Sequence, residues 1–467
     1  MKSLGFKDRS LCAYFVMFTG TLSVIGALLG LIGGYFMSDV LIQANATTYS
    51  VTGLVKDVSP SSLLVGFGGL TAIFCLTSFF CYQFVRGKEP GLFIAGNRSQ
   101  AGLSLSLRAA NCISGLIPTK NKFPLRLALR KPLSVFLIVV AVMSYSVCMI
   151  LGQSLNISSQ KVLESQTIGY HYEFDTKYSE FQTEPAPEGA VPYLDRTGRF
   201  MIGRHEIEQT VIGLHTFNGV YELQNAKGNM LAVLKAGEAY INSGLHEMYG
   251  LHPGNTFVAD IAGVSLELTV ADIAVNAKAA SIYVNADQLS ERIRIPIGAY
   301  NGVLSMEKMK GGIATTKEQR IENLNREAVS SNSSAVINQA IGGLIGAILI
   351  FIALYVNLQD NTRDILILHM MGYRTKQIRK TMIDVYMPIV WMVFALTLAP
   401  SIFMARSIQK SLSISTNDYM PFGTSIVVIL FVFAVLNLIY WFVQALFGLG
   451  MKRIIAKEEI TEIIYAE

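Results

Sequence analysis

The chain has 467 residues, of which 51% are hydrophobic and only 15% are charged, and its formal net charge is +5. Its mean hydropathy of +0.42 is too high for an ordinary soluble protein. These values exclude a soluble globular domain as the main component and indicate a membrane protein.

Six uncharged apolar segments are long enough to cross a bilayer, which takes about 20 residues of helix. They lie at 11–36, 62–85, 132–152, 336–356, 385–405 and 424–449. The first is too long and too glycine-rich for a cleavable signal peptide, and it lacks a convincing cleavage site. The fold class predicted is therefore an α-helical multi-pass membrane protein with six spans, the first two forming a pair within residues 1–86.

Lys and Arg residues are enriched in the short loops that stay in the cytoplasm. Residues 86–131 carry nine Lys and Arg against one acid, and residues 357–383 carry five against two. With six spans, both segments and both termini fall on the same side, which we expect to be the cytoplasm. The end of the basic loop 87–131, FPLRLALRKPL, has the pattern of an interfacial helix, and a plain basic flank is the alternative.

The large segment 153–335 then falls outside the cytoplasm. It holds 15 Lys and Arg against 21 Asp and Glu, a net charge of −6, so the positive charge of the chain reflects membrane topology and not nucleic-acid binding. Period-two alternation at 170–181 and apolar runs farther on predict strands, and 237–249 predicts a helix. The segment is therefore expected to be an extracytoplasmic mixed α/β domain. Further strands are predicted at 210–214, 230–234, 256–261, 265–271 and 280–284.

Polar, helix-prone sequences flank this domain on both sides. Residues 153–168 continue the third span, and residues 315–338 lead directly into the fourth, at 336–356. If both are helical, they form a two-helix stalk. A flexible linker is the alternative, and the serine-rich stretch 330–334 favours it locally.

The short segment 357–383 separates the fourth span from residues 384–467, which hold the last two spans and the tail. It opens with turn-prone residues, continues as a helical run to Gly372, and ends in a basic amphipathic run. A glycine suits the left-handed residue that closes a helix. A short surface helix with polar ends is typical of a docking segment, and an ordinary cytoplasmic loop is the alternative.

Motifs for chemistry are missing or incomplete. His246-Glu247 begins a zinc-protease pattern, but Gly250 stands where the second histidine is needed. No GxxxxGK[ST] loop occurs, so the chain cannot bind ATP by that route. The spans carry almost no ionisable residue, which argues against an ion-coupled carrier. We expect no enzyme, no catalytic residue, no metal and no cofactor in this chain.

Residues 132–467 resemble the FtsX-like permease unit, the membrane subunit of MacB-like (type VII, mechanotransmission) ABC transporters. The resemblance rests on the order span, external domain and three spans, and on the pair Arg363-Asp364, the aliphatic helix, Gly372-Tyr373 and the basic run after them. Asp364 stands where glutamate is usual, and His369 stands where a basic residue is common. Residues 1–131 look like the extra span pair of ten-span permeases, whose first unit would come from another polypeptide or a second copy.

The resemblance implies a non-catalytic permease subunit in a bacterial cell membrane, with both termini in the cytoplasm. A separate ABC ATPase, which binds ATP and Mg, would drive movement of the external domain to export or extract a peptide, lipoprotein or hydrophobic compound. The alternative is a regulator of a cell-wall hydrolase, or a peptide-sensing or resistance module without bulk transport. Other implied partners are a second permease, of the same or a different chain, and membrane lipid. The implied coupling residues are Arg363, Asp364, Leu368, Gly372, Tyr373, Arg374 and Lys376.

Overall fold

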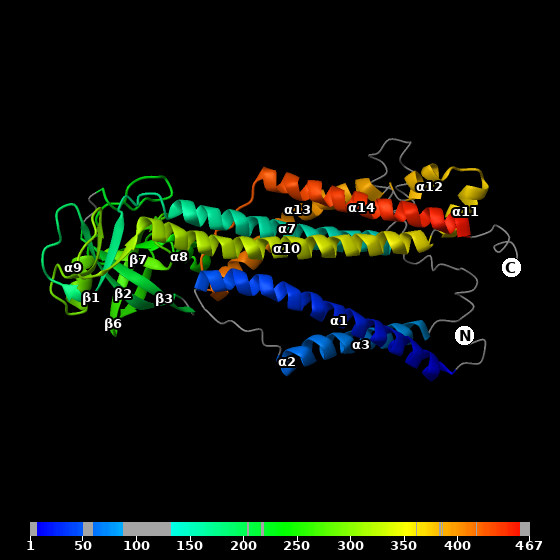
Figure 1. The fold of residues 1–467 in the computed structure, drawn as a ribbon, viewed down its shortest axis with the longest axis horizontal. Helices are drawn as coiled ribbons and strands as arrows, with labels where there is room; N and C mark the ends of the chain where they lie inside the picture. The colour runs from blue at the N-terminus through cyan, green and yellow to red at the C-terminus, as the bar shows by residue number, and fades with distance from the viewer. Residues whose placement is uncertain are drawn as a thin grey trace. The chain divides into compact units, whose positions relative to one another are not determined.

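The computed structural model describes residues 7–49, 59–86, 132–202, 205–215, 219–360, 362–382, 384, 386–416 and 418–457 (Figure 1). The chain divides into two compact units, Met1–Arg130 and Lys131–Glu467. The predicted interfacial helix in the loop 87–131 and the acidic end of the tail lie outside the described residues.

Six helices in the described part are long and apolar enough to cross a membrane, which confirms the predicted spans. All six extend beyond the predicted apolar segments at one end or both. The spans lie in α1 (Asp8–Tyr49), η2 and α3 (Leu64–Gly69 and Leu70–Arg86, preceded by α2, Pro60–Leu63), α7 (Pro132–Ser165), α10 (Lys317–Asp360), α13 (Tyr386–Thr416) and α14 (Ile426–Lys457).

In the first unit, α1 and α3 form a hairpin. The Thr19 hydroxyl donates a hydrogen bond to the Ser78 hydroxyl at 3.1 Å, and the Tyr82 hydroxyl donates to the Asp8 carbonyl at 3.1 Å. Inside a bilayer, polar side chains have no water to bond with, so hydrogen bonds of this kind between apolar helices help to hold the pair together.

In the second unit, α7 is the central helix and packs against α10, α13 and α14. Glycines bring α7 and α10 close together. A β-carbon on Gly346 would lie 2.9 Å from the Tyr145 Cβ, and one on Gly152 would lie 2.6 Å from the Gln339 Cγ. Small residues allow this close approach between membrane helices.

Helices α7 and α10 run side by side into the external domain, residues 166–316 (Figure 1). Helix α10 is continuous over 44 residues, about 66 Å, including the serine-rich stretch 330–334. A helical stalk is therefore the structure observed at 317–338, and not a flexible linker. The polar start of α10 follows directly from the last strand of the domain.

The external domain is built on one nine-stranded sheet, in the order β3-β7-β4-β6-β5-β2-β8-β1-β9. An additional β2–β3 pairing joins the first and sixth strands of this order, so six strands close into a barrel. Two short helices, α8 (Ser243–Tyr249) and α9 (Ala286–Arg292), complete the mixed α/β fold that was predicted. The strands are β1 (Phe174–Gln182), β2 (Val191–Ile202), β3 (His205–Leu214), β4 (Glu238–Asn242), β5 (Thr256–Ile261), β6 (Val264–Ala274), β7 (Ser281–Asn285), β8 (Tyr300–Ser305) and β9 (Ile313–Thr316).

Two local predictions in this domain were wrong. The predicted strand 230–234 contributes only an isolated bridge between Gln224 and Met230. The predicted helix 237–249 begins as β4, and only its second half is helical, as α8. Strand β4 pairs with both β6 and β7, so hydrogen bonds from distant strands override the local helical pattern.

Candidate functional site

The segment between α10 and α13 folds as two short helices, α11 (Thr362–Met370) and α12 (Thr375–Met382). All seven predicted coupling residues lie in these helices or in the turn between them. The pair lies at the end of the membrane bundle that is remote from the external domain (Figure 1). It follows α10 after the single residue 361.

A tight glycine turn closes α11. The Gly372 N–H donates to the His369 carbonyl at 2.9 Å, and the Tyr373 N–H donates to the Leu368 carbonyl at 3.1 Å. This pair of bonds is the Schellman arrangement, in which the closing residue takes a left-handed conformation. Gly372 has φ of +87°, so a side chain at this position would be strained.

Helix α12 begins immediately after the turn. The Arg374 N–H donates to the Gln377 Oε1 at 3.0 Å, and its carbonyl accepts from the Ile378 N–H at 3.1 Å. The side chain three residues into the helix thus satisfies a backbone donor that would otherwise be free. The turn and the first turn of α12 form one defined structure.

The buried side of the segment is anchored to the bundle. Ile365 of α11 and Ile378 of α12 are fully buried, with exposed fractions of 0% and 1%. Asp384, just after α12, accepts a hydrogen bond from Gln444 of α14 and lies 3.8 Å from the Arg379 Nε. These contacts fix α12 against α14.

The opposite side of the segment is an exposed surface with two parts. Its apolar part consists of Ile367, Met370, Met371 and Tyr373, whose exposed fractions are 42%, 52%, 67% and 47%. Its basic part consists of Arg374, Lys376 and Lys380, which are exposed. We call these seven residues the coupling surface. An exposed apolar patch rimmed by charge is typical of a protein-docking site.

Four of the predicted coupling residues are exposed and close together in the chain: Gly372, Tyr373 and Arg374 lie in the turn, and Lys376 lies at the start of α12. Leu368 is half-buried and contributes its carbonyl to the turn. Arg363 and Asp364 lie in the first turn of α11, and their side chains are outside what the structure describes. The coupling role of the seven residues implied by the sequence resemblance, from Arg363 to Lys376, stays a prediction.

Sequence reasoning did not single out Met370 and Met371, or Ile367, as exposed. Their spacing of three and four residues places them on one face of α11, so periodicity could have grouped them. Nothing in the local sequence, however, indicates which face of so short a helix turns away from the bundle.

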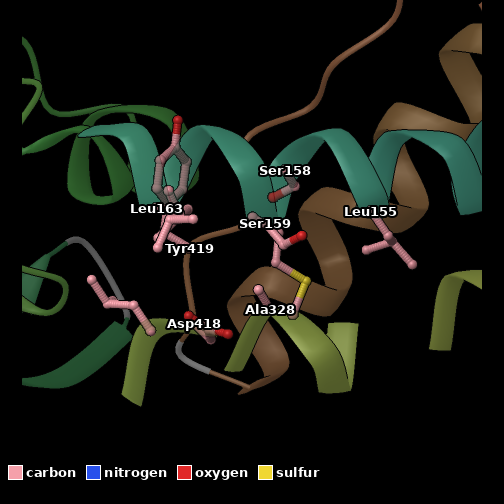
Figure 2. Close-up of a pocket in the computed structure, with 10 residues that line it drawn as sticks. Leu155, Ser158, Ser159, Leu163, Ala328, Asp418 and Tyr419 are labelled. Carbon is pink, nitrogen blue, oxygen red and sulfur yellow. The ribbon is translucent and has the colours of Figure 1, made fainter. Parts of the chain in front are cut away.

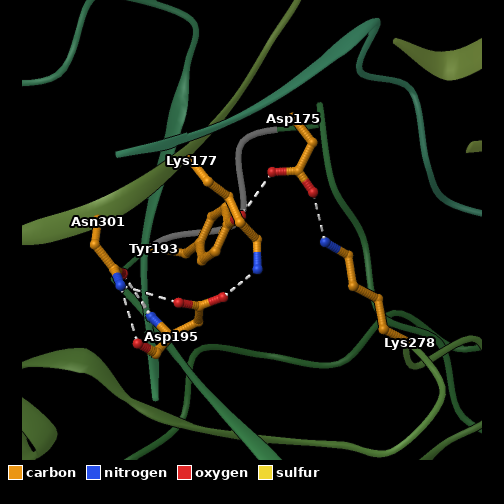
Figure 3. A network of polar contacts seen from close by, with 6 residues as sticks. All are labelled: Asp175, Lys177, Tyr193, Asp195, Lys278 and Asn301. Carbon is orange, nitrogen blue, oxygen red and sulfur yellow. Dashed lines mark hydrogen bonds and ion pairs between the residues drawn. The ribbon is translucent and has the colours of Figure 1, made fainter. Parts of the chain in front are cut away.

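A connected cluster of charged and polar side chains in the external domain comes from β1, β2, β8 and the turn before β7 (Figure 3). The Asp175 carboxylate accepts from the Lys278 Nζ at 2.8 Å and from the Tyr193 hydroxyl at 2.6 Å. Asp195 accepts from the Lys177 Nζ at 2.5 Å and from the Asn301 Nδ2 at 2.9 Å. Both carboxylates are thus neutralised by donors. We interpret the cluster as structural, because no group in it is left free to react.

Six apolar helices in the described part of the chain, an inserted domain and an exposed pair of short surface helices define a multi-pass membrane protein. The family model described as "FtsX-like permease C-terminal" matches residues 1–90 and 340–454. These two segments of the chain are similar to the FtsX-like permease family. Its members are typically non-catalytic membrane subunits.

The family match also changes the description of the first span pair. It includes residues 1–90 as well as the last three spans, so the likeness to this family is not confined to residues 132–467. The sequence of the α1–α3 hairpin therefore also matches the family model.

Among solved structures, the chain is similar to the extracellular domain of the noncanonic ABC-type transporter YknZ from Gram-positive bacteria. The match has 13% sequence identity, covers 32% of this chain and 87% of that chain, and has a TM-score of 0.22. No curated protein matches the chain.

Proposed function

We propose that this chain is the membrane subunit of an ABC transporter, and that a separate ATPase docks on the coupling surface of α11 and α12. The ATPase binds ATP and Mg and supplies the chemical energy. The observation that carries the proposal is the exposed row Ile367, Met370, Met371 and Tyr373 beside three exposed cations, on helices whose other side is anchored. A docking site must be exposed and rigid in this way to pass on force.

The path for that force follows the backbone. Helix α11 follows α10 after one residue, and α10 continues over 44 residues to the external domain. Glycine contacts along α7 keep the two helices together. A push on α11 therefore tilts the α7–α10 pair, and the external domain moves with it.

The product of this movement is mechanical work on an extracytoplasmic partner. The spans carry almost no ionisable residue, so the geometry favours export or extraction of a peptide, lipoprotein or hydrophobic compound over an ion-coupled path. We place α11 and α12, with both termini, in the cytoplasm of a bacterial cell, and a second permease, of the same or a different chain, beside this one in the membrane.

The test identifies what touches the coupling surface in the native cell. A photoreactive benzoylphenylalanine is placed at Met371 or Tyr373, and crosslinked partners are sequenced by mass spectrometry. The expected partner is a protein with a phosphate-cradling ATP-binding loop. The same residue at Ile313, which is 79% exposed on the external domain, is the control and should not capture it. Recovery of no ATPase from either coupling position would overturn the proposal.

Two substitutions give the second readout. Met370→Asp and Met371→Asp place charge on exposed positions and should leave folding intact while reducing recovery of the ATPase about tenfold or more. Met230→Asp, at a position 66% exposed on the external domain, is the matched control. Equal recovery of the ATPase with all three variants would contradict docking at α11.

A further inference from the structure

One face of the barrel presents two large apolar side chains to solvent. Met201 of β2 and Val258 of β5 are direct partners in the β2–β5 ladder, and their exposed fractions are 55% and 46%. Side chains of direct partners lie about 5 Å apart on the same face of a sheet. The pair belongs to the external domain and not to a membrane span, so lipid does not cover it.

Carboxylates flank this apolar pair on both sides. Glu206 of β3 is the ladder partner of Met201, and Glu267 of β6 is the ladder partner of Val258. The next row along the same strands places one arginine between two more carboxylates. Four carboxylates therefore surround one cation and two apolar side chains, all of them exposed. We call this set the acidic face: Arg199, Met201, Glu206, Glu208, Val258, Asp260 and Glu267.

The segment 306–313 between β8 and β9, which we call the basic loop, has the opposite charge beside a similar apolar pair. Met306 and Ile313 are 59% and 79% exposed, and Ile313 is the most exposed large apolar side chain in the described part of the chain. Two exposed lysines, Lys308 and Lys310, and one glutamate lie between them. Neither lysine forms an ion pair with a described residue.

The acidic face and the basic loop cannot meet within one chain. Strand β8 pairs with β2 only at Val191–Tyr193, whereas Met201 lies near the other end of β2. The ten residues from Val191 to Met201 span up to roughly 33 Å of strand. Because β8 is antiparallel to β2, it runs on past Val191 and away from Met201. The two surfaces can therefore be brought together only between two chains.

We propose that the acidic face of one copy of this chain binds the basic loop of a second copy. Met306 and Ile313 pack against Met201 and Val258, which removes apolar surface of both copies from water. The lysines lie against the flanking carboxylates. This pairing brings unlike charges together, whereas two acidic faces or two basic loops would repel each other. In a twofold pair the contact occurs twice, because each copy offers both surfaces.

Both surfaces are small, and the membrane compensates for their size. The spans hold the two copies in one plane with the same orientation, so the contact forms at a high effective concentration. It does not need the area of about 1,200 Å² or more that a stable soluble complex buries. The contact rests on one part of the proposed function, the second permease beside this one, which it identifies as a copy of this chain. It uses no residue of the coupling surface, so its test requires no ATPase.

The test is cysteine crosslinking of the full chain in native membranes, because residues 153–335 contain no cysteine of their own. Two differently tagged forms are coexpressed, one with Val258→Cys and the other with Ile313→Cys. Cysteine is itself a small apolar side chain, so the contact is kept. A disulfide needs Cα atoms within about 7 Å of each other, so mild oxidation should give a dimer that carries both tags.

The control replaces Ile313→Cys by Met230→Cys, at a position 66% exposed on the same domain. It should give the mixed dimer in about fivefold lower yield or less, because the two cysteines do not meet. Equal yields, or no mixed dimer with Ile313→Cys, would overturn the proposed contact. Either result leaves the ATPase crosslinks at Met371 as a separate question, so failure of the contact and failure of the proposed function are distinguishable.

Charge reversal gives the second readout. Lys308→Glu with Lys310→Glu in the Ile313→Cys form should reduce the yield of mixed dimer about fivefold or more, because the loop is then repelled by the acidic face. Glu206→Lys with Glu267→Lys in the other form should restore much of the yield. Reversal of an exposed lysine outside the basic loop, Lys227→Glu, is the control and should change nothing. Unchanged yield in the first variant, or no recovery in the combined one, would overturn the proposal.

Discussion

Tyr419 lies against Gly244, so that a β-carbon on Gly244 would lie 2.9 Å from the Tyr419 Cβ. Gly244 is in the first turn of α8, which Asn242 caps by accepting from the Leu245 N–H at 2.9 Å. Burial, and then the charge of Glu247 and a hydrogen bond to it, raise the pKa of Tyr419. The membrane bundle thus contacts the external domain at a place separate from α7 and α10.

We predict that Tyr419→Ala loosens this contact. Hydrogen exchange of the full chain should become several-fold faster in 243–249 and in 418–424, because the ring that covers the first turn of α8 is gone. Tyr419→Phe keeps the ring, loses only the interaction with Glu247 and should change exchange much less. Unchanged exchange in 243–249 for the alanine variant would show that the contact carries no stability.

Two adjacent glycines of α10 provide a matched pair. A β-carbon on Gly342 would overlap the Cys148 Cβ of α7, whereas one on Gly343 meets nothing within 4 Å. Gly342→Ala should therefore lower the melting temperature of the purified chain, because overpacking costs about 1–3 kcal/mol. Gly343→Ala should be neutral or slightly stabilising, since alanine is the better helix former. Equal melting temperatures for the two variants would refute the close α7–α10 packing.

Arg320, near the start of α10, stacks on two aromatic rings of the external domain. Its guanidinium carbon lies 4.5 Å from the Tyr172 ring centroid and 4.9 Å from that of Tyr170. The guanidinium nitrogens are buried and have no hydrogen-bond partner among the residues described. Such a contact contributes about 2 kcal/mol when desolvated.

Arg320→Met should therefore destabilise the external domain by about 1–2 kcal/mol, measured on the full chain by proteolysis in a urea series. Arg326→Met, at a side chain that is 48% exposed, is the control, with an expected effect within about 0.5 kcal/mol. A larger effect at Arg326 than at Arg320 would contradict the assignment of Arg320 as the joint between stalk and domain.

The Asp175–Lys278 pair is the least exposed of the ion pairs described in the domain. Its side chains are 15% and 26% exposed. Lys278→Met should leave Asp175 with a buried, poorly compensated charge and cost about 3–5 kcal/mol. Lys278→Met combined with Asp175→Leu should recover much of that loss, because no charge remains. The urea series above provides the measurement, and additive losses in the double variant would rule out coupling.

The same pair predicts a pH window of stability. Burial alone raises the pKa of Asp175, but the Lys278 ammonium and hydrogen bonds from Lys278 and Tyr193 outweigh it and hold the pKa below the usual value. Burial lowers the pKa of Lys278, but the negative charge of Asp175 and its hydrogen bond act in the opposite direction, and the net shift of the pKa is upward. The stabilisation is thus present between about pH 4 and pH 10, the usual values of the two groups.

Stability from Asp175 should be lost as the pH falls through its depressed folded pKa, and stability from Lys278 should be lost as the pH rises through its raised one. The difference in unfolding free energy between the native chain and Asp175→Asn, measured from pH 3 to pH 8, should therefore shrink toward the acid end. A difference that grows as the pH falls would contradict the sign of the shift.

Sequence patterns predicted the features that depend on short stretches of chain. Each of the six spans is a continuous apolar run, and Gly372 closes a helix through bonds that span only five residues. The strand 256–261 was also predicted from a local pattern, the alternation of apolar and polar residues, and its observed bounds agree with the prediction. Apolar length, periodicity and turn chemistry are properties that a sequence carries by itself.

Only the tertiary structure decided the rest. The local sequence of β4 predicts a helix, but the segment is a strand because it pairs with β6 and β7. The barrel closes through a β2–β3 pairing, which the local pattern of either strand does not predict. The outward face of α11, with Met370 and Met371, depends on where α10 and α12 lie. The small pocket lined by Leu155, Ala328 and Asp418 (Figure 2) combines three elements that are at least 90 residues apart in the chain. Burial and pairing across such separations are set by packing, so the sequence determined the elements of this protein, and their contacts determined its surfaces.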